Sequence, residues 1–361
     1  MKANGVILAY TVRRFNTTNS SVSWVFTLQC AVAFLITPLG AFLLRTFSCR
    51  LLCLIGGLLA GGGYICAGLF TTSVWHLFVY HSLSGVGFGL MCIPNCLYIH
   101  ANFGRKYTSI FAFGMAFIYV GVAVLPLTQQ WLIDNYGHKW GVACFGGLVL
   151  NCVHIATLLR PTGKLNQLLS KSCQNTIPEV KLHFVDKYFL CFSAFLRHLN
   201  FAILMTFAMV GMFVYSSWAL FLLSFGEAQG LSSLEAVYLS TTAGVGGILG
   251  SITASTLFAF DGMDGITCCL LPTLANGSCL LLSVFFQHFG TLSFLMFVSG
   301  FAQGLQYAGI SGFIPALVCN FHVEQGLVAS CVTEGIFYQI GGLAAGKTLS
   351  IRYFYVVFEH D

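Results

Sequence analysis

Ten stretches of roughly membrane-spanning length, almost free of charged residues, follow one another between residues 22 and 346. Charged residues make up 7% of the chain, against about 25% in a typical soluble domain. A helix needs about 20 consecutive apolar residues to cross the hydrocarbon core of a bilayer. A soluble chain of this length has too little polar surface to cover ten such segments. The sequence therefore predicts an all-α, multi-pass membrane protein with about ten complete transmembrane helices.

The predicted spans are separated by short polar turns, as expected where a chain leaves and re-enters a bilayer. They cover residues 22–44, 51–71, 74–99, 108–132, 140–159, 199–225, 234–258, 266–286, 292–318 and 326–345.

One long stretch, residues 161–197, is polar and basic and leaves five predicted spans on either side. It reads as a loop, with an amphipathic segment near residues 187–197 at the membrane surface. The sequence thus predicts two helical halves joined by a linker. The predicted divisions are a short N-terminal segment 1–21, an N-terminal helical half 22–160, the linker 161–197, a C-terminal helical half 198–346 and a tail 347–361.

The distribution of basic residues predicts the orientation, because cytoplasmic loops are enriched in Lys and Arg. If the linker is cytoplasmic, ten of the 16 basic residues fall on that side, whereas the opposite connections hold only Lys139. Four of the ten lie in short turns, where we expect them to set the topology and latch helix ends: Arg45, Arg50, Arg105 and Lys106. The same orientation places the sequons at Asn16 and Asn19 outside, which predicts a glycoprotein.

Other kinds of chemistry find no support in the sequence. The 15 cysteines are scattered, mostly within apolar segments, where cysteine behaves as a small hydrophobic residue. The chain contains no phosphate-binding loop of the Walker type, no zinc-protease motif and no serine nucleophile elbow. We therefore expect no enzyme activity, no metal, no cofactor and no nucleic-acid partner.

Short motifs in the first half carry a family resemblance. They are Pro126-Leu127-Thr128-Gln129, Leu132-Ile133-Asp134, Tyr136-Gly137-His138-Lys139 and Gly146-Gly147-Leu148. With the turn at residues 45–50, they closely resemble the monocarboxylate transporter family of the major facilitator superfamily, and the resemblance covers most of residues 20–346. It implies a plasma-membrane secondary transporter whose two helical halves move a small organic solute by alternating access. Some members bind an accessory single-span membrane protein, which is a candidate partner here beside the lipid bilayer.

The resemblance also marks departures at both ends of the chain. The ten spans align with helices two to eleven of twelve, so that residues 1–21 hold only the end of helix one. The tail 347–361 stands where the family has helix twelve. The alternative hypothesis is therefore a non-transporting, transporter-derived membrane protein or an incomplete isoform.

A further departure concerns charge. The resemblance implies, for proton-coupled symporters of the family, an aspartate and an arginine four residues apart in helix eight, where this chain has Gly247 and Ser251. A carboxylate in a low-dielectric cavity needs a fixed cation with paired donors. The sequence therefore favours facilitated movement of a neutral or zwitterionic solute over the family's proton-coupled scheme.

Glu334 is the clearest candidate site residue, because an ionisable group in mid-bilayer costs about 2.5–3.5 kcal/mol. It lies in the last predicted span, where it would bind a cationic or zwitterionic substrate or carry a proton. The alternative is a neutral polar contact between helices.

Other cavity candidates come from helical spacing and from the resemblance. Gln303, Gln306 and Tyr307 share a face at i, i+3 and i+4, on the helix that lines the cavity in facilitators of this type. The remaining candidates for substrate contact are Asn95, Tyr215 and Trp218, with an outer aromatic belt as the alternative place for Trp218.

Overall fold

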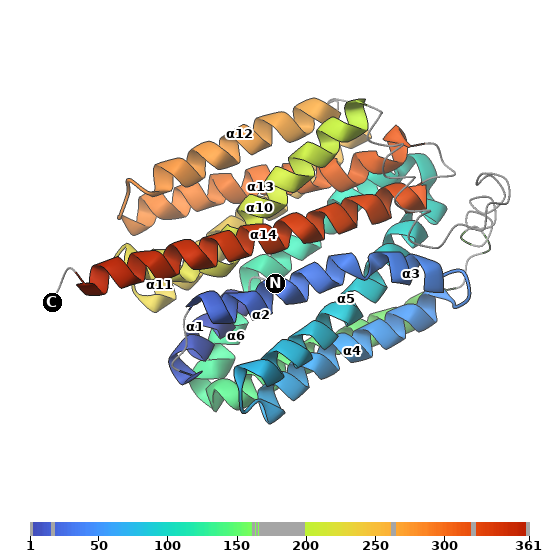
Figure 1. Ribbon diagram of the computed structural model, residues 1–361. Coiled ribbons are helices and arrows are strands. Elements are labelled where there is room, and N and C mark those ends of the chain that lie inside the picture. The colour runs from blue at the N-terminus through green and yellow to red at the C-terminus, as the bar shows by residue number, and fades with distance from the viewer. Residues whose placement is uncertain are drawn as a thin grey trace.

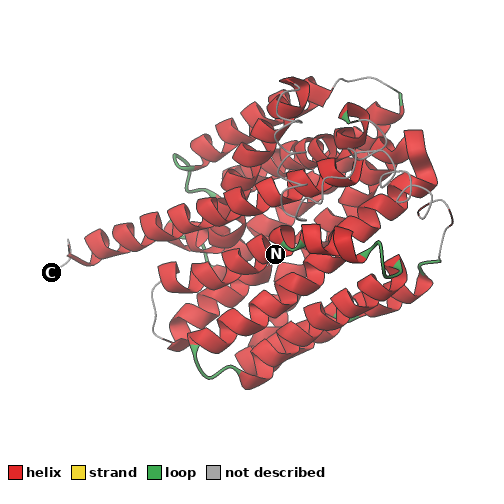
Figure 2. Cartoon of the chain, turned by 45° about the vertical axis from the view of Figure 1, so that its right-hand side comes forward, coloured by secondary structure: helices red, strands yellow, loops and turns green. Residues whose placement is uncertain are grey.

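The computed structural model is a bundle of helices that run roughly side by side (Figure 1). It describes residues 3–15, 19–160, 163, 165, 199–260, 265–318 and 323–358. Within these residues the structure is helical and contains no strand (Figure 2). The helices are α1 (Ala3–Phe15), α2 (Asn19–Leu35), α3 (Thr37–Leu43), α4 (Cys49–Phe70), α5 (Val74–Phe103), the 3-10 turn η1 (Gly104–Lys106), α6 (Tyr107–Val149), α7 (Asn151–Leu158), α10 (Leu199–Ala228), α11 (Ser233–Ala259), α12 (Gly265–Ser283), α13 (Phe289–Leu317) and α14 (Val323–Phe358).

Almost all of the predicted linker 161–197 lies outside the described residues, as does the sequon residue Asn16. The predicted boundary at residue 346 is not a helix end, because α14 continues to Phe358 and projects beyond the other helices (Figure 1).

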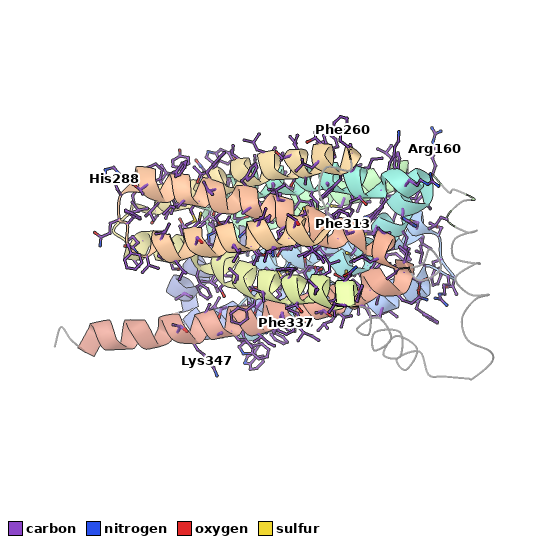
Figure 3. All side chains as sticks on the ribbon, turned by 90° about the horizontal axis from the view of Figure 1, so that it is seen from above. Arg160, Phe260, His288, Phe313, Phe337 and Lys347 are labelled. Carbon is purple, nitrogen blue, oxygen red and sulfur yellow. The ribbon has the colours of Figure 1, made fainter. Side chains whose placement is uncertain are left out.

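The helices form two halves, α1–α7 and α10–α14, which face each other across the bundle (Figure 1). Across the boundary α6 packs against α11, and α2 packs against α14. Arg160 lies at one end of the bundle and His288 at the other (Figure 3). The structure thus confirms the all-α, two-half architecture expected from the sequence.

Local sequence signals explain several helix boundaries. Pro38 stands in the first turn of α3, where its missing N–H is tolerated, and the segment formed by α2 and α3 breaks at Ile36. At the start of α11, the Ser232 hydroxyl accepts from the Glu235 backbone N–H (3.3 Å), and the Glu235 carboxylate accepts from the Ser232 backbone N–H (2.9 Å). This reciprocal capping satisfies two backbone donors that would otherwise lack partners.

The helix α6 contains a reversal at Gly137, whose backbone angles are φ 74° and ψ 166°. This region of backbone conformation is essentially restricted to glycine. A side-chain carbon on Gly141 would lie 3.0 Å from the Ile133 backbone, so the segments on either side of Gly137 run back against each other. The two predicted spans 108–132 and 140–159 are therefore two antiparallel helical segments.

Seven helices in the described part of the chain are long and apolar enough to cross a membrane. One of these stretches, Val74–Leu158, is 85 residues long and contains the turns at η1 and Gly137. The helix α13 is 29 residues long and carries no Lys, Arg, Asp or Glu, yet it is not among the seven. The number of about ten complete spans therefore remains a prediction.

Large apolar side chains cover the outside of the bundle (Figure 3). Trp75 is 76% exposed and Leu281 is 72% exposed, and many other large hydrophobic residues are exposed as well. A soluble monomer rarely exposes apolar surface on this scale. The outer surface is suited to contact with lipid.

Glycines set the closest approach between helices within the C-terminal half. A side-chain carbon on Gly246 or Gly250 of α11 would overlap the backbone of α13, at Phe297 and Phe301. A side-chain carbon on Gly300 of α13 would likewise overlap the Ala243 backbone of α11. Such small-residue seams drive helix association in membranes, where apolar side chains gain little from leaving lipid.

Gly137→Ala should lower the stability of the detergent-purified protein by about 1–3 kcal/mol, because alanine is strained at this backbone conformation. The control is Gly147→Ala in the same helix, where an added carbon meets no atom within 4 Å. Thermal unfolding measures both variants. Equal stability of the two would contradict the reversal at Gly137.

Candidate functional site

Glu334 lies on α14 and is buried, with 6% of its surface exposed. The Ser330 hydroxyl, one turn earlier on the same helix, donates to Glu334 Oε1 at 2.6 Å. Cys92 and Cys96 of α5 lie within electrostatic range of Glu334. Since α5 belongs to the other half, the carboxyl group lies at the boundary between the halves.

Three tyrosines from three helices of the C-terminal half meet next to this carboxyl group. The ring of Tyr215 on α10 lies 5.5 Å from that of Tyr307 on α13 and 6.3 Å from that of Tyr338 on α14. Tyr338 is one helical turn from Glu334, and Tyr307 lies within electrostatic range of it. We call Glu334 and these three residues the Glu334–tyrosine cluster.

The residues of the predicted polar face on α13 have different surroundings in the structure. Gln303 is 1% exposed, and neither atom of its amide has a hydrogen-bond partner in the described part of the chain. It lies one turn from Tyr307, on the cluster side of the helix. Gln306 instead donates to Thr273 Oγ1 of α12 at 2.9 Å, within the C-terminal half. Gln303 thus shares a helix face with Tyr307 by spacing, whereas the Gln306 amide bonds to α12.

Asn95 and Trp218 also lie outside the cluster. Asn95 is exposed and accepts a 3.7 Å hydrogen bond from the Cys53 thiol of α4. The Trp218 indole is buried and donates to Met296 Sδ at 3.1 Å. Its burial argues against the outer aromatic belt.

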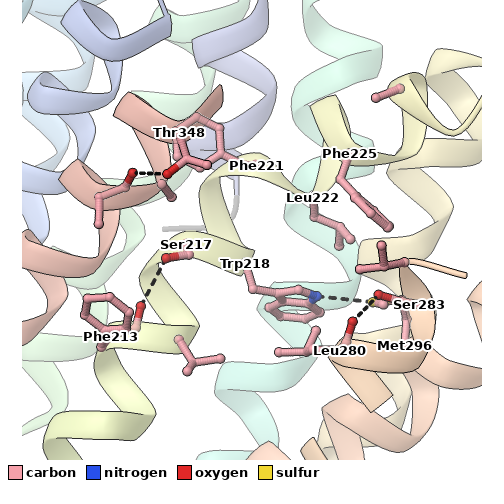
Figure 4. A pocket seen from close by; sticks show the side chains of 15 residues that line it. Phe213, Ser217, Trp218, Phe221, Leu222, Phe225, Leu280, Ser283, Met296 and Thr348 are labelled. Carbon is pink, nitrogen blue, oxygen red and sulfur yellow. Dashed lines mark hydrogen bonds between the residues drawn. The ribbon is translucent and has the colours of Figure 1, made fainter. Parts of the chain in front are cut away.

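Trp218 lines a cavity of about 800 Å³ (Figure 4). The lining residues come from α10, α12, α13 and α14, all in the C-terminal half, and include Phe213, Phe225, Leu280, Met296 and Thr348. The cavity is mostly apolar, and its described lining residues all belong to the C-terminal half. Its wall adjoins the Glu334–tyrosine cluster, because the Trp218 ring lies 6.3 Å from the ring of Tyr215.

Gly247 and Ser251 occupy the helix positions where the family resemblance implies a charge pair. A side-chain carbon on Gly247 would overlap the ring of Tyr119 from α6. Ser251 is fully buried, and its hydroxyl has no partner within the residues described. The space beside α11 is thus filled by an aromatic ring from the opposite half.

An ion pair joins the halves at the end of the bundle that we predict to be cytoplasmic. Arg45 Nη2, in the turn after α3, lies 3.0 Å from Glu324 Oε1 at the start of α14. Glu324 is almost completely buried, whereas 26% of the Arg45 side chain is exposed. The three other basic residues predicted at this end, Arg50, Arg105 and Lys106, are exposed.

A second buried polar network lies within the N-terminal half. The Gln29 amide donates to Tyr64 Oη at 2.9 Å and to Ser84 Oγ at 3.1 Å. His81 Nδ1 lies 3.1 Å from Gln29 Oε1. This network links α2, α4 and α5 and so stabilises that half internally.

Sequence reasoning missed Tyr119, Tyr338 and Glu324 as members of these sites. Tyr338 was detectable, because it follows Glu334 at i+4 on one helix face. Glu324 stands in the first turn of its helix, but its partner is 279 positions away in the chain. No local pattern reveals such a pair.

The fold and site define a multi-pass helical membrane protein with two halves and a polar cluster at their boundary. The sequence profile of the Major Facilitator Superfamily matches residues 1–346, and the chain belongs to this superfamily.

Curated relatives are monocarboxylate transporters, as the motifs predicted. Monocarboxylate transporter 12 of Mus musculus is 26% identical over 293 residues, covering 76% of this chain and 60% of that protein. Monocarboxylate transporter 13 of Rattus norvegicus is 26% identical over 352 residues, covering 96% of this chain and 77% of that protein. This chain thus spans about 60% of the length of the mouse relative.

The crystal structure of the human organic anion transporter MFSD10 (TETRAN) has a similar fold. The TM-score is 0.70 at 14% sequence identity, with 96% of this chain and 84% of that chain covered. At this identity the similarity concerns the fold alone.

Gly247→Ala should destabilise the protein by about 1–3 kcal/mol, because the added carbon overpacks against Tyr119. In a Tyr119→Ala background the same change should cost much less, since the ring is gone. Thermal unfolding of the four proteins in detergent measures the difference. Gly277→Ala, with open space around it, controls for helix propensity, and an equal cost in both backgrounds would contradict the contact.

Proposed function

We propose that the chain is a secondary transporter that moves a small organic solute, a monocarboxylate or a related neutral or zwitterionic compound, by alternating access. The observation that carries this proposal is the position of the Glu334–tyrosine cluster. It is buried at the boundary between the two halves, and the halves contact each other toward both ends of the bundle. Membership in the superfamily and the names of the relatives support it. We further propose a plasma-membrane location, with an accessory single-span protein as a candidate partner.

Polar contacts join the halves toward the predicted cytoplasmic end. Beside the ion pair of Arg45 and Glu324, the Thr108 hydroxyl of α6 donates to the Gly312 carbonyl of α13 at 3.0 Å. The Ser109 hydroxyl of α6 donates to the Ser255 carbonyl of α11 at 2.8 Å. Water can replace such bonds when the halves separate, so this end is suited to open and close.

Apolar contacts join the halves toward the opposite end. Ile7 and Leu8 of α1 pack in one buried cluster with Leu220 and Phe221 of α10. The backbone of Gly5 approaches α10 so closely that an added carbon would lie 3.1 Å from the Leu220 carbonyl oxygen. The Glu334–tyrosine cluster lies between these two contact regions, where a solute would be enclosed during transport.

Purified protein in liposomes should accumulate at least one solute of a matched three-carbon series, namely lactate, alanine and 1,2-propanediol, above empty liposomes. Saturable uptake is expected, because a carrier has a limited number of sites. Tyr338→Leu should reduce this uptake, whereas Tyr238→Leu should not, since Tyr238 is 41% exposed on the bundle surface.

Solute uptake measured with and without an inward proton gradient, in the same preparation, tests whether transport is coupled to protons. We expect uptake without the gradient, as the absence of the helix-eight charge pair implies. Strict dependence on inward protons would contradict facilitated movement. Absence of uptake for every solute would contradict transport and favour the non-transporting alternative.

Glu324→Gln should favour opening at the predicted cytoplasmic end, because it removes the charge that holds Arg45. This variant is preferable to a change of Arg45, which would leave a buried carboxylate without its cation. The readout is the rate at which a water-soluble thiol reagent modifies Cys96 and Cys331, resolved by mass spectrometry of their peptides. Several-fold faster modification is expected.

The matched control is Arg105→Gln, an exposed residue at the same end. It should leave the rates unchanged. Equal rates in wild type and Glu324→Gln would show that this ion pair does not hold the end closed.

A further inference from the structure

We infer that the Glu334–tyrosine cluster recognises the positively charged group of its solute, a protonated amine or a guanidinium, and therefore selects cations or zwitterions over plain anions. This inference rests on the proposed function and specifies its substrate class. It differs from what the names of the relatives would suggest, since those name monocarboxylates and organic anions.

The first argument is the placement of negative charge. Two carboxyl groups are buried in the described part of the chain, those of Glu324 and Glu334. Arg45 holds Glu324 at 3.0 Å. The hydrogen-bond partner of Glu334 is the neutral hydroxyl of Ser330. A neutral donor does not balance a charge, and a buried acid is retained in a membrane protein chiefly where it has a partner or a function.

The second argument is the placement of positive charge. Among the Lys and Arg side chains that the structure describes, Arg45 is 26% exposed and is paired with Glu324 at one end of the bundle. The others are exposed, namely Arg50, Arg105, Lys106, Lys139, Arg160 and Lys347. An anionic solute in a low-dielectric site needs a cationic partner with matching donors. Among the described residues, the surroundings of Glu334 offer carboxyl, hydroxyl and thiol groups instead.

The third argument is the group of aromatic rings in the cluster. The rings of Tyr215, Tyr307 and Tyr338 lie together, and Tyr338 stands one helical turn from Glu334. The face of a tyrosine ring attracts an ammonium or guanidinium group within about 6 Å. A carboxyl group and several aromatic faces are complementary to a cation in both charge and shape.

Gln303 supplies an additional polar contact. Its amide is buried without a partner among the described residues, and buried polar groups are nearly always hydrogen-bonded. Since Gln303 is one turn from Tyr307, its carbonyl oxygen can accept from an amine N–H. Glu334 and Tyr338 are buried, so a solute reaches them only when the halves separate.

Three probes that share a phenethyl group test the charge assignment in proteoliposomes. They are phenethylamine, a cation; phenylalanine, a zwitterion; and 3-phenylpropionate, an anion. Uptake of the cation and the zwitterion should exceed that of the anion by about tenfold or more, which corresponds to about 1.4 kcal/mol. Glu334→Gln should raise the KM for the cation by a similar factor, whereas Glu334→Asp should retain part of the affinity.

Folding of each variant is checked by size exclusion and thermal unfolding in detergent. If Glu334→Gln fails to fold, the ratio among the three probes on the wild-type protein still decides. Preference for 3-phenylpropionate would overturn the charge assignment alone, as would a folded Glu334→Gln that transports the cation unchanged. Failure of all three probes, like failure of the three-carbon series, would contradict transport itself.

Proton-driven uptake of 3-phenylpropionate that Glu334→Gln abolishes would make Glu334 a proton carrier and would also overturn the inference. Glu324→Gln is the matched control, since it neutralises the other buried carboxyl group at the end of the bundle. It should leave the preference among the three probes unchanged.

Discussion

The interior of a bilayer contains no water, so the polar atoms of this chain must find partners within the protein. Helices satisfy the backbone, but apolar side chains gain little by leaving lipid for another helix. Close backbone contact must therefore hold the helices together, which is why glycines such as Gly246 and Gly300 lie where α11 and α13 meet. The same constraint makes a buried charge costly. The ion pair of Arg45 with Glu324 and the hydrogen bond from Ser330 to Glu334 both follow from it.

Different kinds of contact hold the helices within a half and the two halves together. Within the C-terminal half, glycines bring the backbones of α11 and α13 into direct contact. Between the halves, the predicted cytoplasmic end is closed by side chains that can bond to water instead, such as Ser109 with Ser255. Polar side chains that can bond to water instead allow that end to open without disturbing the glycine contacts inside a half. This division of contacts fits the proposed alternating access.

Much of the fold was predictable from the sequence, because span length and polar turns follow directly from the thickness of a bilayer. The reversal at Gly137 was foreseen as a break between two spans, and the buried position of Glu334 followed from its apolar surroundings. Side-chain direction was harder. Gln303 and Gln306 share a helix face by spacing, yet Gln306 bonds to Thr273 inside its own half. The ion pair with Glu324 depends on how the two halves meet, which no local pattern encodes.

The comparison of α11 with α14 shows where this chain carries buried charge. A fixed Asp–Arg pair has no net charge and offers paired donors, which suits a carboxylate. In this chain Tyr119 fills the space beside Gly247, and the buried carboxyl group belongs to α14 at Glu334 instead, with no described Lys or Arg beside it. Fold alone does not define cargo, so the cargo of this chain has to be argued from the residues at the boundary between its halves.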